Sequence, residues 1–149
     1  MRDSKTDQSE KMTEQWIQGC VVQRISFRDG LVLNLDDYNE LDVFVPLTLT
    51  LPATKIDDAE VVTIDPMAIR DEERPLFDFA GAMCMHADWD EDGTLHLRFS
   101  GGHEIEVRSD EHRTAWEMYG KYHGYAACLP HGQVRIVRTD VSEDASAEP

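Results

Sequence analysis

The sequence has few cysteines, no long hydrophobic run and little positive charge. Its three cysteines, Cys20, Cys84 and Cys128, lie far apart and form no CxxC pair, which argues against a disulfide framework or a zinc ribbon. Reduced thiols are typical of cytosolic proteins. No stretch approaches 18 apolar residues, and the first sixteen residues contain no apolar leader. We therefore expect neither a transmembrane helix nor a secretory signal, and we predict a cytoplasmic protein.

Acidic residues dominate the charge. The chain of 149 residues has 14 Lys and Arg against 30 Asp and Glu, a net charge of −16 at pH 7. Such a field repels nucleic-acid phosphates and anionic lipid headgroups, so we expect no nucleic-acid or membrane partner. It attracts basic proteins, although the same charge also serves solubility. The pattern predicts at most a basic protein partner, indicates no cofactor, and leaves the oligomeric state open.

Alternation of apolar and polar residues predicts β-strands over most of the chain. "ISF" and "LVLNL" flank Asp29-Gly30, a dipeptide typical of hairpin turns. The one helical signal is Asp65 as N-cap before Pro66, with Pro75 expected to end the helix. The pattern predicts a mainly β, antiparallel sandwich or barrel-like fold with one or two short helices.

The two ends of the chain differ in composition from the rest. Residues 1–13 are polar and charged, and residues 139–149 are acidic and rich in small side chains. Both segments are expected to be disordered. The remaining residues, 14–138, contain no linker-like stretch and are predicted to form a single β-rich domain.

One pattern occurs twice. "RDGLVLNLDDYNELDV" at 28–43 resembles "DEDGTLHLRFSGGHEIEV" at 90–107. We predict an internal duplication of a three-strand meander, with pseudo-repeats at 19–45 and 81–108 in the same strand order. The "GG" of the second copy is interpreted as a turn and not as a phosphate loop, because no helix follows it.

Several ordered landmarks resemble a small actinobacterial family of unknown function. They are Gly19 with "FRDG", "IDP", the Gly81 segment, "DGTLHLRFSGG", "AWEMYG" and "CLPHG". Members of this family carry an AWEL-x-G element followed by a PGG turn, and His131 stands here where the family usually has glycine. The resemblance covers residues 16 to about 138. It implies no activity and no catalytic residue.

The hairpin of the second copy allows a prediction of register. Pairing Ala87 with Leu95, and Met85 with Leu97, places these four residues on the core side and leaves a three-residue loop with Gly93 at a bulge.

That register places His86 opposite His96, and the next hairpin places His96 opposite Glu106. Two histidines and a carboxylate resemble a metal-ligand set. However, strands lie about 4.8 Å apart, so the outer two residues start about 9.6 Å from each other. We expect an exposed row of side chains that does not converge, and we predict no metal site. A metal-dependent hydrolase that uses this row is the alternative function.

A thiol hydrolase is the other enzymatic alternative. Cys128 has His131 three residues later and His123 before it. It follows two alanines in an apolar strand, where a cysteine usually serves as a small buried hydrophobe. We therefore favour a non-enzymatic function, and the catalytic residues of any enzymatic one stay unknown.

The segment "WEMYGKYHGYAACLPHG" is the most typical of a binding loop. Tyrosine supplies a large and rigid contact area at low entropic cost. The alternative is a hairpin whose aromatic residues only cap the end of the sandwich. We predict a non-catalytic protein-binding module, of which an immunity-type protein that blocks a basic toxin is one form. The predicted binding residues are Tyr119, Tyr122, His123, Tyr125 and His131.

Overall fold

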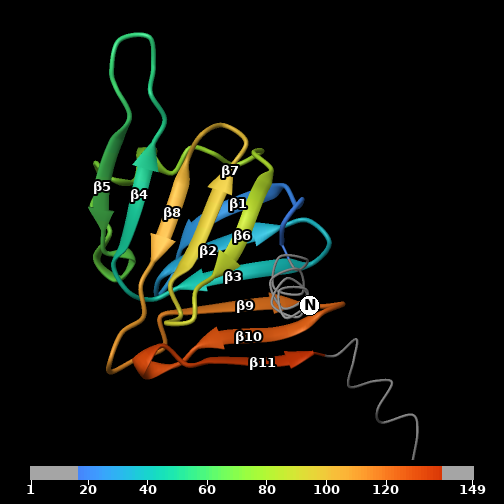
Figure 1. The fold of residues 1–149 in the computed structure, drawn as a ribbon. Helices are drawn as coiled ribbons and strands as arrows, with labels where there is room; N and C mark the ends of the chain where they lie inside the picture. The colour runs from blue at the N-terminus through green and yellow to red at the C-terminus, as the bar shows by residue number, and fades with distance from the viewer. Residues whose placement is uncertain (1–16, 139–149) are drawn as a thin grey trace, which may run out of the picture.

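Two antiparallel sheets pack into a mainly β sandwich, as predicted (Figure 1). The structure is a computed structural model, and it describes residues 17–138; the two predicted disordered tails lie outside these residues. The six-stranded sheet has the order β1-β2-β3-β9-β10-β11, and the five-stranded sheet has the order β5-β4-β8-β7-β6. The strands are β1 (Val22–Phe27), β2 (Leu31–Leu35), β3 (Asn39–Val43), β4 (Leu47–Leu51), β5 (Glu60–Ile64), β6 (Cys84–Trp89), β7 (Leu95–Phe99), β8 (Glu104–Val107), β9 (Trp116–Gly120), β10 (Gly124–Cys128) and β11 (Val134–Arg138).

The core follows from the alternation of side chains along the strands. Leu31, Leu33 and Leu35 of β2 are buried, as are Leu95 and Leu97 of β7, while the residues between them face outward. The inward sets of the two sheets form one hydrophobic cluster. The polar residues of each strand therefore lie on the outer faces of the sandwich, where the candidate sites are found.

The segments 19–45 and 81–108 have the same strand order and the same pairing register. Each is a meander of three consecutive strands, β1-β2-β3 in one sheet and β6-β7-β8 in the other. Leu31 opposite Val43 recurs, 64 residues later, as Leu95 opposite Val107. A duplication as the origin of this equivalence stays a prediction.

The equivalence extends to the first and fourth strands. The register shifts at Gln23 in β1 and at Met85 in β6, one bulge in each meander. After its meander the chain crosses to the opposite sheet, so β4 pairs with β8, and β9 pairs with β3. The two halves therefore exchange strands, and an isolated bridge between Val21 and Met83 joins the free edges of β1 and β6.

The predicted register of the β6–β7 hairpin is wrong by two residues. Ala87 lies opposite Leu97, and Trp89 lies opposite Leu95. Five residues (90–94) lie between the two strands, and the Asp90 amide donates a hydrogen bond to the Thr94 carbonyl within this loop. Met85, predicted in the core, is 52% exposed, since the bulge moves its side chain outward and gives the inward position to the neighbouring cysteine.

The expected helix is shorter than predicted. Asp65 caps it, accepting a hydrogen bond from the Met67 amide at 3.0 Å, but the 3-10 turn η1 ends after three residues (Pro66–Ala68). Pro75 does not end a helix; it lies inside a second turn, η2 (Arg74–Leu76). A third turn, η3 (Pro130–Gly132), was not predicted. Among residues 17–138 no helix is long and apolar enough to cross a membrane.

Candidate functional site

All four tyrosines of the chain lie at one end of the six-stranded sheet. We call Tyr38, Tyr119, Tyr122 and Tyr125 the tyrosine cluster. Tyr38 belongs to the β2–β3 hairpin, and the other three belong to the β9–β10 hairpin. Because β3 pairs with β9, with Glu40 opposite Tyr119, two hairpins that are distant in sequence become neighbours.

The β2–β3 turn holds Tyr38 outward in a strained backbone conformation. Asp37 and Tyr38 have φ of 65° and 62°, a region that bulky residues rarely adopt. Tyr38 is 69% exposed. Its ring meets Tyr122 edge to face at a centroid distance of 5.9 Å, and the Lys121 ammonium lies 4.7 Å from the Tyr38 centroid. The strain is retained while the side chain stays accessible, a combination found at functional sites.

Tyr119 and Tyr125 share one carboxylate. Both phenol groups donate hydrogen bonds of 2.7 Å to Glu117, one to each oxygen, and their rings lie 5.1 Å apart. Burial, together with the hydrogen bond to Glu117, raises the pKa of Tyr125 to about 12 and that of Tyr119 further. The two phenols are therefore neutral donors at physiological pH.

A second carboxyl group lies directly opposite Glu117. Asp42 pairs with it across the β3–β9 ladder, and both side chains point to the outer face. Burial raises the pKa of Asp42 to about 7, assisted by its hydrogen bond to Glu40 and by the charges of Glu40 and Glu117. Its Oδ1 atom is buried without a hydrogen-bond partner. The carboxyl groups of Glu40, Asp42 and Glu117, here called the acidic row, thus repel one another.

A depression of about 780 Å³ lies beside Glu40, at one end of the acidic row. Its lining includes Tyr38, Glu40, Tyr119 and Lys121. It is open to solvent on the face of the sheet and combines aromatic, anionic and cationic side chains. Such a lining suits contact with a protein segment through aromatic anchors and hydrogen bonds.

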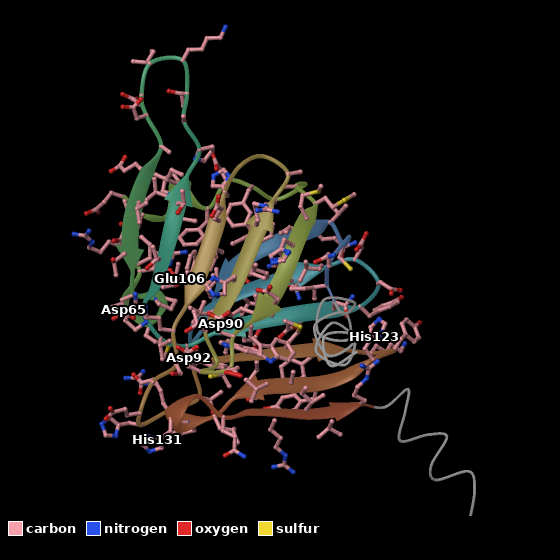
Figure 2. The ribbon with its side chains drawn as sticks, viewed as in Figure 1. Asp65, Asp90, Asp92, Glu106, His123 and His131 are labelled. Carbon is pink, nitrogen blue, oxygen red and sulfur yellow. The ribbon has the colours of Figure 1, made fainter. Side chains whose placement is uncertain are left out.

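The structure brings together four of the five predicted binding residues. His123 lies within the same hairpin, its Nε2 4.0 Å from the Asp37 carboxylate. His131 does not join them. It lies in η3 beyond the far end of β10, and Figure 2 shows His123 and His131 at opposite ends of the sheet. Sequence reasoning missed Tyr38 and Asp42, because nothing local indicates that β3 and β9 are neighbours.

The histidine row on the five-stranded sheet differs from the prediction. His96 lies opposite Glu106, as expected, but His86 lies opposite Arg98 instead of His96. Each histidine pairs with an aspartate: His86 Nε2 lies 2.9 Å from Asp88, and His96 Nε2 lies 2.8 Å from Asp90. Within residues 17–138 no group of three His, Cys, Asp or Glu side chains is placed to hold a metal ion.

Cys128 is a core residue. It is fully buried, and its thiol donates a long, weak hydrogen bond of 3.8 Å to the Leu129 carbonyl. Burial, with a contribution from Asp92, raises the pKa of the thiol to about 11. A nucleophilic cysteine needs the opposite shift. The geometry therefore gives no support to the thiol hydrolase alternative.

Comparisons with known proteins give one family match. Neither the search of curated proteins nor that of solved structures found a match. A family model matches residues 13–138, most of the chain, and its family has no known function. The actinobacterial origin and the AWEL-x-G and PGG elements stay predictions. The chain belongs to the family of unknown function DUF6188.

Proposed function

We propose that this protein is a non-catalytic protein-binding module, and that its binding surface is the tyrosine cluster with the adjacent acidic row. The observation that carries the proposal is the convergence of all four tyrosines, from two hairpins, at one end of the six-stranded sheet, where Tyr38 and Tyr119 line a depression. Tyrosine is enriched among the residues that contribute most to protein–protein affinity. The strained turn that exposes Tyr38 supports the same interpretation.

The proposed partner is a basic protein in the cytoplasm. The net charge of −16 and the acidic row would both attract it. An immunity-type role, in which this protein blocks a basic toxin, is one concrete form.

The equivalence of the two halves supports a specialised surface. We propose that the halves arose by duplication and that only the six-stranded sheet acquired the binding surface. Thr50 stands where Tyr119 stands, and Val61 stands where Tyr125 stands. The outer face of the five-stranded sheet is thus a natural internal control.

Site-specific cross-linking tests this function. The photoreactive residue p-benzoylphenylalanine replaces Tyr122 in one variant, and Ile56, 91% exposed in the β4–β5 loop, in the control. In cells of the source organism we expect one protein to be cross-linked at position 122 and not at position 56. With the purified partner, Tyr38→Ser and Tyr122→Ser should each weaken binding about ten-fold or more. Identical adducts at both positions, or unchanged affinity, would contradict the proposal.

A further inference from the structure

The outer faces of the two sheets differ at equivalent positions. On the five-stranded sheet, His96 lies opposite Glu106. At the equivalent pair on the six-stranded sheet, 64 residues earlier, Val32 lies opposite Asp42. A carboxylate is present in both halves, but the histidine next to it is present in only one.

The next pair along the strands repeats this difference. Arg98 lies opposite Glu104 on the five-stranded sheet, whereas Asn34 lies opposite Glu40 on the other. Asn34 contributes only a neutral hydrogen bond, from its Nδ2 to Glu40 at 3.3 Å. At these two positions the six-stranded face therefore lacks the potential cations that its counterpart has.

The neighbouring strand adds a further negative charge. Glu117 lies opposite Asp42, where the other half has Thr48 opposite Glu106. The nearest basic residues across the sheet are Arg135 on β11, two strands from Glu117, and Arg24 on β1, two strands from Glu40. Lys121 shares the lining of the depression with Glu40. The acidic row thus holds three carboxyl groups on adjacent positions, without the basic residues that accompany its counterpart.

The two faces show the electrostatic consequence. His96 has a raised pKa: burial lowers it, but Asp90, Glu106 and Asp88 together outweigh that effect. The carboxylates on that face thus favour the protonated form of His96. Asp42, in contrast, keeps a proton up to about pH 7 and has an oxygen without a partner. On the six-stranded face the phenols of Tyr119 and Tyr125 satisfy Glu117, whereas the buried Asp42 Oδ1 has no hydrogen-bond donor.

We infer that the partner protein supplies the missing cation, as an arginine side chain that lies over Asp42 and Glu117 beside the rings of Tyr119 and Tyr125. This inference rests on the proposed function and specifies its partner. A guanidinium group fits better than an ammonium group, because its planar fork matches carboxylates and its face stacks on aromatic rings.

Short peptides provide the probe. The acetylated and amidated peptides GRGRG, GKGKG and GQGQG are titrated separately into the ¹⁵N-labelled full chain. We expect the arginine peptide to shift the amide signals around Asp42 and Glu117, the lysine peptide to bind at least three-fold more weakly, and the glutamine peptide to give no shift. Val32→Arg introduces the cation internally and should weaken binding of GRGRG at least ten-fold.

A matched variant on the other face is the control. His96→Val should leave binding of GRGRG unchanged, since it alters only the five-stranded sheet. If Val32→Arg fails to fold, Asn34→Arg replaces it, which copies Arg98 of the other half. The inference would be overturned if all three peptides bind equally, or if Val32→Arg and His96→Val weaken binding of GRGRG equally. It would also be overturned if Ca²⁺ shifts these amide signals and arginine does not, or if sedimentation shows a dimer that covers this face.

The cross-linked partner separates this inference from the proposed function. Val32→Arg and Tyr122→Ser should both weaken its binding. If Tyr122→Ser weakens binding while Val32→Arg does not, the tyrosine cluster binds a partner and the arginine inference is wrong. If neither weakens binding, the proposed function is wrong as well.

Discussion

Asp42 shows how three neighbouring carboxyl groups change the pH dependence of stability. Burial, followed by Glu40 and Glu117, raises its pKa to about 7, whereas the unfolded chain releases this proton at about pH 4. The folded state therefore binds more protons than the unfolded state between these values. In this window the free energy of unfolding contributed by Asp42 falls as pH rises.

Asp42→Asn removes that dependence. We expect the melting temperature of the variant, measured by differential scanning calorimetry, to increase relative to that of the wild type as pH rises from about 4 to about 8. Asp71→Asn, at an exposed position, is the control and should show no such gain. A constant difference between Asp42→Asn and wild type across this range would show that the proton is not retained on folding.

His96 gives the complementary prediction. Burial lowers its pKa, but the hydrogen bond to Asp90 at 2.8 Å and the charges of Glu106 and Asp88 raise it overall. Its stabilising contribution is complete below the unfolded pKa of about 6.5 and is lost as pH rises through the folded pKa. Asp90→Asn should lower the His96 pKa, measured by NMR titration of the ring signals. An unchanged titration midpoint would contradict the role of Asp90.

Residue types on the outer faces were predictable, but their partners were not. The sequence predicts that His86, His96 and Glu106 share one face, because strands alternate strictly. It predicts neither the position of the β6–β7 loop, which makes Arg98 the partner of His86, nor the bulge at Met85, which moves that side chain outward. A bulge adds one residue without leaving a break in composition.

At the scale of elements, the β6–β7 loop depends on close packing around glycine. Gly93 has φ of 87°, and a Cβ atom there would lie 2.6 Å from the Cys128 Sγ and 2.7 Å from the Gly132 carbonyl oxygen. Its own carbonyl accepts the Trp116 indole hydrogen bond at 2.9 Å. Any side chain at this position must displace both backbone and core.

Gly93→Ala and Gly19→Ala form a matched pair. Gly19 has a similar φ of 91°, but nothing lies within 4 Å of the position that a Cβ atom would take there. Both variants bear the backbone strain, whereas only Gly93→Ala bears the clash. We expect Gly93→Ala to lose at least about 1 kcal/mol more unfolding free energy than Gly19→Ala, measured by urea denaturation. Equal losses would show that the loop relaxes.

The strands themselves follow from local sequence, while the short turns follow only in part. Asp65 caps a turn as its side chain predicts. The turn ends after Ala68 because the next residue, Ile69, adopts extended backbone angles and packs against the core. Burial of an apolar side chain thus overrides the helical tendency of the segment that follows.

At the scale of the whole molecule, the decisive feature is the exchange of strands between the halves. Alternation shows which face of a strand is buried, but it does not identify its neighbours. The pairing of β3 with β9 joins residues more than seventy positions apart. This pairing creates both the tyrosine cluster and the acidic row, so the site could be predicted only as far as the β9–β10 hairpin.

The last prediction follows from the net charge of the molecule. Arg138 and the tail account for −3 of the net −16, which leaves −13 on residues 1–137. A field of this size accelerates encounter with a basic partner about ten-fold or more at low salt. The Debye length falls from about 10 Å at 0.1 M salt to about 3 Å at 1 M, so a steered association must slow.

Stopped-flow association with the cross-linked partner measures this effect. We expect the association rate constant to fall steeply between 0.1 and about 1 M salt, while that of Glu40→Gln, in the acidic row, is lower and less dependent on salt. Glu60→Gln removes the same charge from β5, at the edge of the other sheet, and should behave as the wild type. An association rate independent of salt would mean that the charge serves solubility alone. Equal effects of the two substitutions would mean that the whole field, and not the acidic row, guides the partner.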